Sequence, residues 1–110
     1  MQVRHVAAEQ RFSADKMVKV NLFDSPNMFA DVYCLEPGQS QKPHSHAGAD
    51  KLYYVLEGRG VFQVGAEKAE WGPGTLVPAP SGEEHGVENP GPGRLTLLVV
   101  MSPNPNHRKE

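Results

Sequence analysis

Short runs of β-branched and aromatic residues follow one another along the chain, separated by turns rich in glycine, proline, asparagine and aspartate. The run at residues 51–57 ends at Gly58 and is typical of a strand. The run at residues 94–101 is the most apolar, and we predict that it forms a central strand. The pattern predicts an all-β fold of eight to ten short antiparallel strands without a convincing helix. The other predicted strands span residues 17–23, 28–35, 60–64, 67–71, 75–79 and 84–88.

The length of 110 residues corresponds to one domain. We place its core at about residues 17–101. Residues 1–16 are polar and mixed, and they are expected to form either an edge strand or a loose arm. Residues 102–110 contain two prolines and are expected to be a flexible tail.

The charge balance is mildly acidic, with 11 lysines and arginines against 13 aspartates and glutamates. It argues against a nucleic-acid partner, which would require clustered basic residues. No apolar run approaches the ~20 residues of a membrane span, and the first 20 residues lack the apolar core of a signal peptide. The single cysteine, Cys34, cannot form an intramolecular disulfide. We therefore predict a cytoplasmic protein that does not engage membranes.

Three histidines stand at positions suited to a common site. His44 and His46 are two residues apart, and residues i and i+2 of a strand point to the same face. Such a pair alone is weak evidence for a metal site. His85 strengthens it, because a turn rich in proline and glycine delivers this histidine to the start of another predicted strand.

The spacing around these histidines resembles the two sequence motifs of the cupin superfamily. In the first, Gly38 is followed after five residues by His44-Ser45-His46, then after four residues by Lys51, and after six more by Gly58. The second motif is matched at every position by Gly74, Pro80, Gly82, His85 and Asn89. A short spacer between the motifs is typical of small microbial cupins.

The resemblance implies a single cupin domain over residues 1–110, folded as an antiparallel, jelly-roll-like β-barrel that holds a divalent metal. Carried over to this chain, the usual histidine ligands are His44, His46 and His85. Iron, nickel, manganese, zinc and copper all suit such imidazole ligands, and the ligand set does not choose between them.

The glutamate of the first motif is missing. Lys51 occupies its position when the spacing to Gly58 is preserved; Asp50 would occupy it at a shorter spacing and is a candidate fourth metal ligand. A lysine ammonium ~4 Å from a dication would be repelled by roughly 8 kcal/mol at an effective dielectric of about 20. Lys51 could therefore turn away to pair with a carboxylate, lose its proton, or leave the pocket metal-free with an anionic ligand.

Further candidates surround these residues. Lys51, Tyr53 and Gln63 are predicted to line the ligand pocket, and Lys51 and Glu84 are the candidate catalytic residues. For Tyr54 a position in the core, and for Glu83 a position on the surface, are the alternatives to a role in the pocket. No role is expected for four other groups: His5 and His107 as solvated side chains, Cys34 as a packed thiol, and Asn89 as a turn residue.

We predict a small metal-binding cupin that holds a small polar or phenolic molecule, as a metal-dependent oxygenase or isomerase. The alternative is a non-catalytic binding or sensing module, including a metal-free form with an anionic ligand near Lys51. Whether the chain is an enzyme is left open. We also expect a homodimer, because residues 17–35 are apolar and an uncovered strand edge invites pairing.

Overall fold

The computed structural model describes residues 1–107, and this part of the chain contains nine β-strands and two short 3₁₀-helices. Eight of these nine strands agree closely with those predicted from the sequence, and the ninth, at Ser40–His44, was not predicted. None of the helices of residues 1–107 has the length and apolar character needed to cross a membrane. The elements are η1 (Val6–Glu9), β1 (Val18–Ser25), β2 (Met28–Leu35), β3 (Ser40–His44), β4 (Asp50–Glu57), β5 (Gly60–Val64), β6 (Glu67–Trp71), β7 (Leu76–Ala79), β8 (His85–Glu88), β9 (Leu95–Ser102) and η2 (Pro105–His107).

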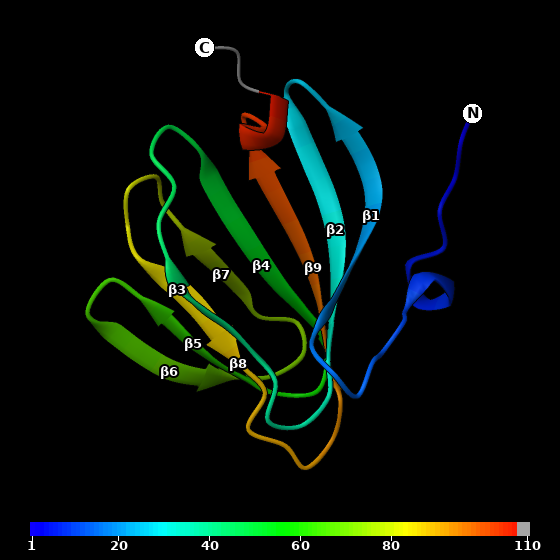
Figure 1. Ribbon diagram of the computed structural model, residues 1–110, viewed down its shortest axis with the longest axis vertical. Helices are drawn as coiled ribbons and strands as arrows, with labels where there is room; N and C mark the ends of the chain where they lie inside the picture. The colour runs from blue at the N-terminus through cyan, green and yellow to red at the C-terminus, as the bar shows by residue number, and fades with distance from the viewer. Residues whose placement is uncertain (108–110) are drawn as a thin grey trace.

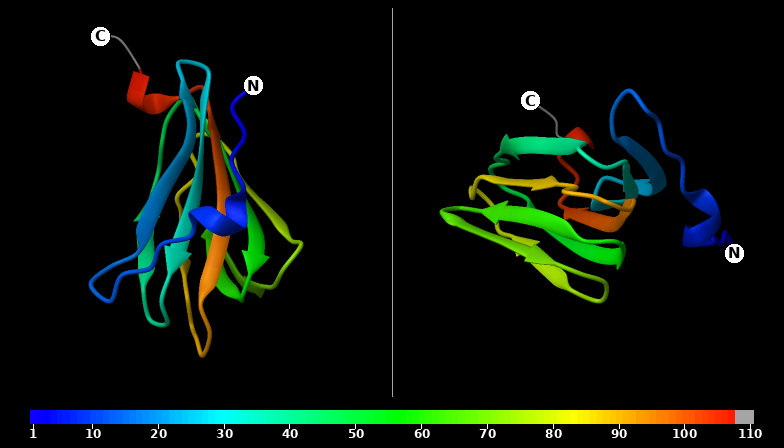
Figure 2. Two further views of the ribbon diagram at one scale, coloured as in Figure 1. Left: turned by 90° about the vertical axis from the view of Figure 1, so that its right-hand side faces the viewer. Right: turned by 90° about the horizontal axis from the view of Figure 1, so that it is seen from below.

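The strands form two antiparallel sheets that face each other (Figures 1 and 2). One sheet has the strand order β1-β2-β9-β4-β7, and the other has the order β3-β8-β5-β6. The apolar strand β9 lies in the middle of the larger sheet, so its predicted central position is confirmed. The smaller sheet ends in the fully exposed strand β6, whose charged residues suit an open sheet edge. The all-β, antiparallel barrel expected from the sequence is therefore confirmed.

The hydrophobic core fills the space between the sheets, and strand alternation decides which side chains enter it. In β4, Tyr53 and Val55 are completely buried, whereas Leu52 and Tyr54 are each 38% exposed. This alternation follows from the two-residue period of a strand. It also places Lys51 on the inner face, in register with Met101 of β9.

Gly58, the last residue of the first motif, is required by a close backbone approach. Its φ is +82°, and a Cβ atom added there would lie 2.1 Å from the carbonyl oxygen of Arg94. Only glycine adopts this conformation without strain. The motif glycine therefore allows β4 to turn sharply towards β5 beside the start of β9.

The N-terminal segment forms neither an edge strand nor a wholly loose arm, because it contains the 3₁₀-helix η1 and bonds to the larger sheet. The Arg4 guanidinium donates to the carboxylate of Glu9 and to the backbone oxygen of Leu22. The backbone N–H of Arg11 donates to the Cys34 sulfur at 3.4 Å. Cys34 is fully buried, as expected of a packed thiol, and burial raises its pKa.

The C-terminal segment contacts the β1–β2 turn as far as the described residues extend, and the flexibility expected for residues 102–110 stays a prediction. Asn104 is only 2% exposed, and its Nδ2 donates to Asp24 Oδ1 at 2.8 Å and to the Ser25 oxygen at 2.9 Å. His107 also contacts the Asp24 carboxylate instead of being solvated alone. The remaining tail, residues 108–110, lies outside the described residues.

Candidate metal and ligand site

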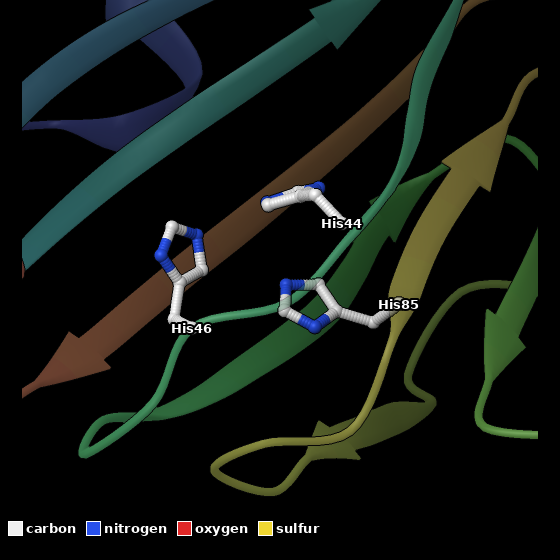
Figure 3. Close-up of side chains that lie close together, drawn as sticks. All are labelled: His44, His46 and His85. Carbon is white, nitrogen blue, oxygen red and sulfur yellow. The ribbon is translucent and has the colours of Figure 1, made fainter.

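The structure brings the three histidines singled out by the sequence to one place (Figure 3). His44 is the last residue of β3, His46 follows two residues later, and His85 begins β8. One ring nitrogen from each lies within 4.8 Å of the others. The ring centroids are 4.5 Å apart for His44 and His85, and 4.8 Å apart for His44 and His46. These separations suit three ligands of one small ion.

Strand pairing produces this convergence. His44 and His85 are Cα partners across β3 and β8, so their rings project from opposed backbone positions. Gly86 permits the close approach, since a Cβ atom there would lie 2.8 Å from the Gln41 oxygen and 2.9 Å from the Pro43 nitrogen. His46 lies beyond the end of β3, not within a strand as the spacing argument assumed.

Backbone carbonyls orient two of the imidazole rings. His44 Nδ1 lies 2.9 Å from the Lys42 oxygen, and His85 Nδ1 lies 3.0 Å from the Glu83 oxygen. A carbonyl oxygen only accepts, so each Nδ1 carries the proton and each Nε2 presents a lone pair. Metal-binding histidines commonly have this arrangement.

The donor set fits a divalent transition metal. His85 is 2% exposed, and its Nε2 is buried without a hydrogen-bond partner among residues 1–107. A buried polar atom of this kind requires a partner, and a metal ion is one. Burial, the largest cause, also lowers the pKa of His85 to about 4. The imidazole is therefore neutral at pH 7, as coordination requires.

Lys51, in the position of the missing glutamate, is 2% exposed and faces the barrel interior. Its Nζ donates to Gln41 Oε1 at 3.1 Å and lies 4.9 Å and 5.2 Å from the ring centroids of Tyr53 and Tyr33. Burial is the main reason that its pKa falls to about 7, with a smaller contribution from Lys19. Of the outcomes expected for this lysine, pairing with a carboxylate is not found among the ion pairs of residues 1–107.

Gln41 connects Lys51 to the two tyrosines and was not identified from the sequence. Its Oε1 also accepts from the Tyr53 hydroxyl at 3.2 Å, and its Nε2 donates to the Tyr33 hydroxyl at 3.4 Å. Both tyrosines are almost completely buried, and burial raises the pKa of each phenol. Both phenols therefore stay protonated, and both hydroxyl groups are hydrogen-bonded to Gln41.

A cavity of about 300 Å³ joins this group to the histidines. Its wall includes His44, His46, Lys51 and Gln41. The charged side chains of Lys19 and Asp31 also line it, and Pro105 and Asn106 of η2 contribute its edge. The cavity is thus small, is lined by polar and charged side chains as well as by Phe29 and Met101, and adjoins His44 and His46.

Three of the predicted site residues lie elsewhere. Asp50 is exposed, and its Oδ1 accepts from the Ser81 backbone N–H at 2.9 Å. Gln63 follows the inward-facing Phe62 and therefore faces the outside of the smaller sheet. There its Nε2 donates to the Oε1 atom of the exposed Glu84 at 3.2 Å. Strand alternation thus turns Asp50 and Gln63 away from the barrel interior, and Glu84 is exposed immediately before β8.

Two residues without an assigned role behave as expected. Asn89 is 1% exposed; its Nδ2 donates to the Leu35 and Gly93 oxygens, each at 2.9 Å, and its Oδ1 accepts from the Gly91 N–H. Asn89 therefore ties its own turn to the end of β2. The side chain of His5 lies on the surface before η1 and makes no capping hydrogen bond.

Two facing antiparallel sheets that enclose converging histidines define a cupin-type barrel. A family model described as the cupin domain matches residues 31–101, and the chain belongs to this family. Among solved structures, TT1209 from Thermus thermophilus is 44% identical with a TM-score of 0.93, covering 96% of this chain and 100% of that one. An RmlC-like cupin protein from Desulfovibrio desulfuricans is 26% identical with a TM-score of 0.83, covering 94% and 97%.

Among curated proteins, an oxalate-binding protein from Thermotoga maritima is 37% identical over 67 residues. The match covers 61% of this chain and 55% of that protein, so the chain spans about half the length of this relative. The family assignment therefore concerns the barrel, and the relative's name describes that protein's ligand.

Proposed function

We propose that this cupin binds one divalent transition-metal ion through Nε2 of His44, His46 and His85, and holds a small polar or phenolic molecule beside it. The observation that carries the proposal is the buried Nε2 of His85, which has no hydrogen-bond partner among residues 1–107 although two other imidazoles lie close by. Iron, nickel, manganese, zinc and copper all fit such nitrogen ligands.

The ligand would occupy the cavity of about 300 Å³ next to the histidines. Its volume lies at the lower end of the range for small-molecule sites, which favours a small ligand. The name of the oxalate-binding relative supports a small polar ligand as well. A bound metal ion would supply a Lewis acid that polarises an oxygen atom of the ligand.

The residues of the chain favour binding over a particular reaction. Glu84, one of the candidate catalytic residues, is exposed immediately before β8 and accepts a hydrogen bond from Gln63. Lys51 lies inside the cavity, and its pKa of about 7 suits proton exchange near neutral pH. If the protein acts as an oxygenase or isomerase, Lys51 is therefore the residue that we assign to proton transfer.

Titration of metal-free protein with Co²⁺ in a calorimeter tests the metal site. We expect one ion per chain for the wild type and loss of this stoichiometric binding for His85→Ala, with circular dichroism showing that the variant is folded. His5→Ala is the matched control, because His5 is an exposed histidine outside the site, and it should bind like the wild type. Equal Co²⁺ affinity in His85→Ala would contradict the proposal.

A further inference from the structure

Lys51 is a buried amine whose Nζ forms no ion pair with a carboxylate within residues 1–107. The residue is 2% exposed. Its one side-chain hydrogen bond goes to Gln41 Oε1, an uncharged acceptor. An ammonium group has three N–H donors, so the hydrogen bond to Gln41 leaves donors available towards the cavity.

The groups around Lys51 hold it in place without neutralising it. Its Nζ lies over the rings of Tyr33 and Tyr53 at cation–π distances. The hydroxyl groups of both tyrosines are hydrogen-bonded to Gln41. The side-chain amide of Gln41 is therefore hydrogen-bonded to both tyrosines and to Lys51, and it fixes the position of Lys51 Nζ. The groups in direct contact with Lys51 Nζ are therefore uncharged, whereas Lys19 and Asp31 act on it from elsewhere in the cavity wall.

With Lys51 protonated, the side chains that line the cavity carry a net positive charge before any metal binds. Lys51 and Lys19 line it, against the single carboxylate of Asp31, which accepts a hydrogen bond from Asn21. The metal-ligating side chains that converge within residues 1–107 are three histidines without a carboxylate. A dication here would add to the positive charge, and nothing in the ligand set would offset it.

We infer that the ligand of this site is a small carboxylate anion, which supplies the negative charge that the three histidine ligands lack. One carboxylate of this ligand would lie at the metal ion, with Lys51 as a specificity-determining residue. The inference rests on the function proposed above. Because the cavity holds about 300 Å³, it favours dicarboxylates of a few carbons over larger acids. In this arrangement the anion removes the repulsion between the ion and the ammonium, so metal and carboxylate bind with positive coupling.

Malonate and its uncharged diamide, malonamide, are matched probes for this inference. Co²⁺-loaded wild-type protein is titrated with each, and the visible absorption of the ion distinguishes ligand binding from removal of the ion. We expect malonate to bind and malonamide not to bind. In Lys51→Met, malonate should bind about tenfold more weakly or worse, because a hydrogen bond to a charged group is lost.

Lys68→Met is the control, because Lys68 is an exposed lysine on β6, and malonate should bind it as tightly as the wild type. Equal binding of malonate and malonamide, or unchanged malonate affinity in Lys51→Met, would overturn the inference while Co²⁺ binding upholds the proposed function. Absence of Co²⁺ binding to the wild type would overturn both. Malonate affinity that is independent of Co²⁺ would overturn the coupling between ion and carboxylate.

Discussion

Replacement of Lys51 by methionine should stabilise the metal-free protein at pH 7. Methionine keeps the apolar stem of the side chain and removes an ammonium that is 2% exposed. Substitution of buried charged groups by apolar residues of similar volume is often stabilising. The native lysine is therefore expected to reduce stability in return for a role in the cavity.

The size of the effect follows from the pKa of Lys51, which burial lowers from 10.5 to about 7. This difference corresponds to about 4 kcal/mol of destabilisation at pH 7. Loss of the hydrogen bond to Gln41 and of the two cation–π contacts offsets about 2 kcal/mol of the gain. We expect a net gain of about 2 kcal/mol, or roughly 8 °C in Tm.

The pH dependence gives a second signature. Between about pH 7 and 10.5 the unfolded chain binds a proton at Lys51 that the folded protein does not, so wild-type stability rises with pH. Lys51→Met lacks this contribution. The difference in free energy of unfolding between variant and wild type should therefore fall by about 2 kcal/mol from pH 7 to pH 9.

Urea unfolding of chelator-treated protein at pH 7, 8 and 9, followed by the fluorescence of Trp71, measures both quantities. The exposed Lys68 provides the control variant Lys68→Met, which should stay within about 0.5 kcal/mol of the wild type at each pH. The reasoning fails if Lys51→Met is less stable than the wild type at pH 7, or if the difference between them does not change with pH.

Two further predictions concern buried polar groups. Because burial lowers the pKa of His85 to about 4, the unfolded chain is protonated there first as the pH falls, and the metal-free protein should lose up to about 3 kcal/mol between pH 6.5 and 4. Urea unfolding at pH 7 and 5 tests this, and His85→Gln should lose less on acidification; an equal loss would refute it. Asn89→Ala should lower the free energy of unfolding by about 2 kcal/mol, because the buried oxygen of Leu35 loses its side-chain donor. Thermal unfolding would disprove this if Tm changed by less than about 2 °C.

The strands and the histidine group could be predicted because their signals are local. Turn residues separate the apolar runs, and motif spacing singles out His44, His46 and His85. The inward orientation of Lys51 could not be settled in the same way, since both faces of residues 51–57 contain apolar side chains. Packing of β4 between β7 and β9 decides it.

The residues that the sequence missed depend on irregular or distant contacts. The register of β3 against β8 shifts between Gln41 and His44, so strict alternation fails to show that both line one cavity. Asn104 bonds to groups about 80 positions earlier in the chain, and no local pattern reveals such a partner. Homodimer formation and the cytoplasmic location stay predictions.

The docking of η2 has a practical consequence for handling the protein. Pro105 and Asn106 form part of the cavity wall together with His44 and His46. A purification tag joined to the chain directly after His107, the last residue of η2, would therefore begin close to the cavity. An oligohistidine tag in that position would bring competing imidazoles to the metal site, and metal analysis is therefore best performed on protein tagged at the other end or cleaved.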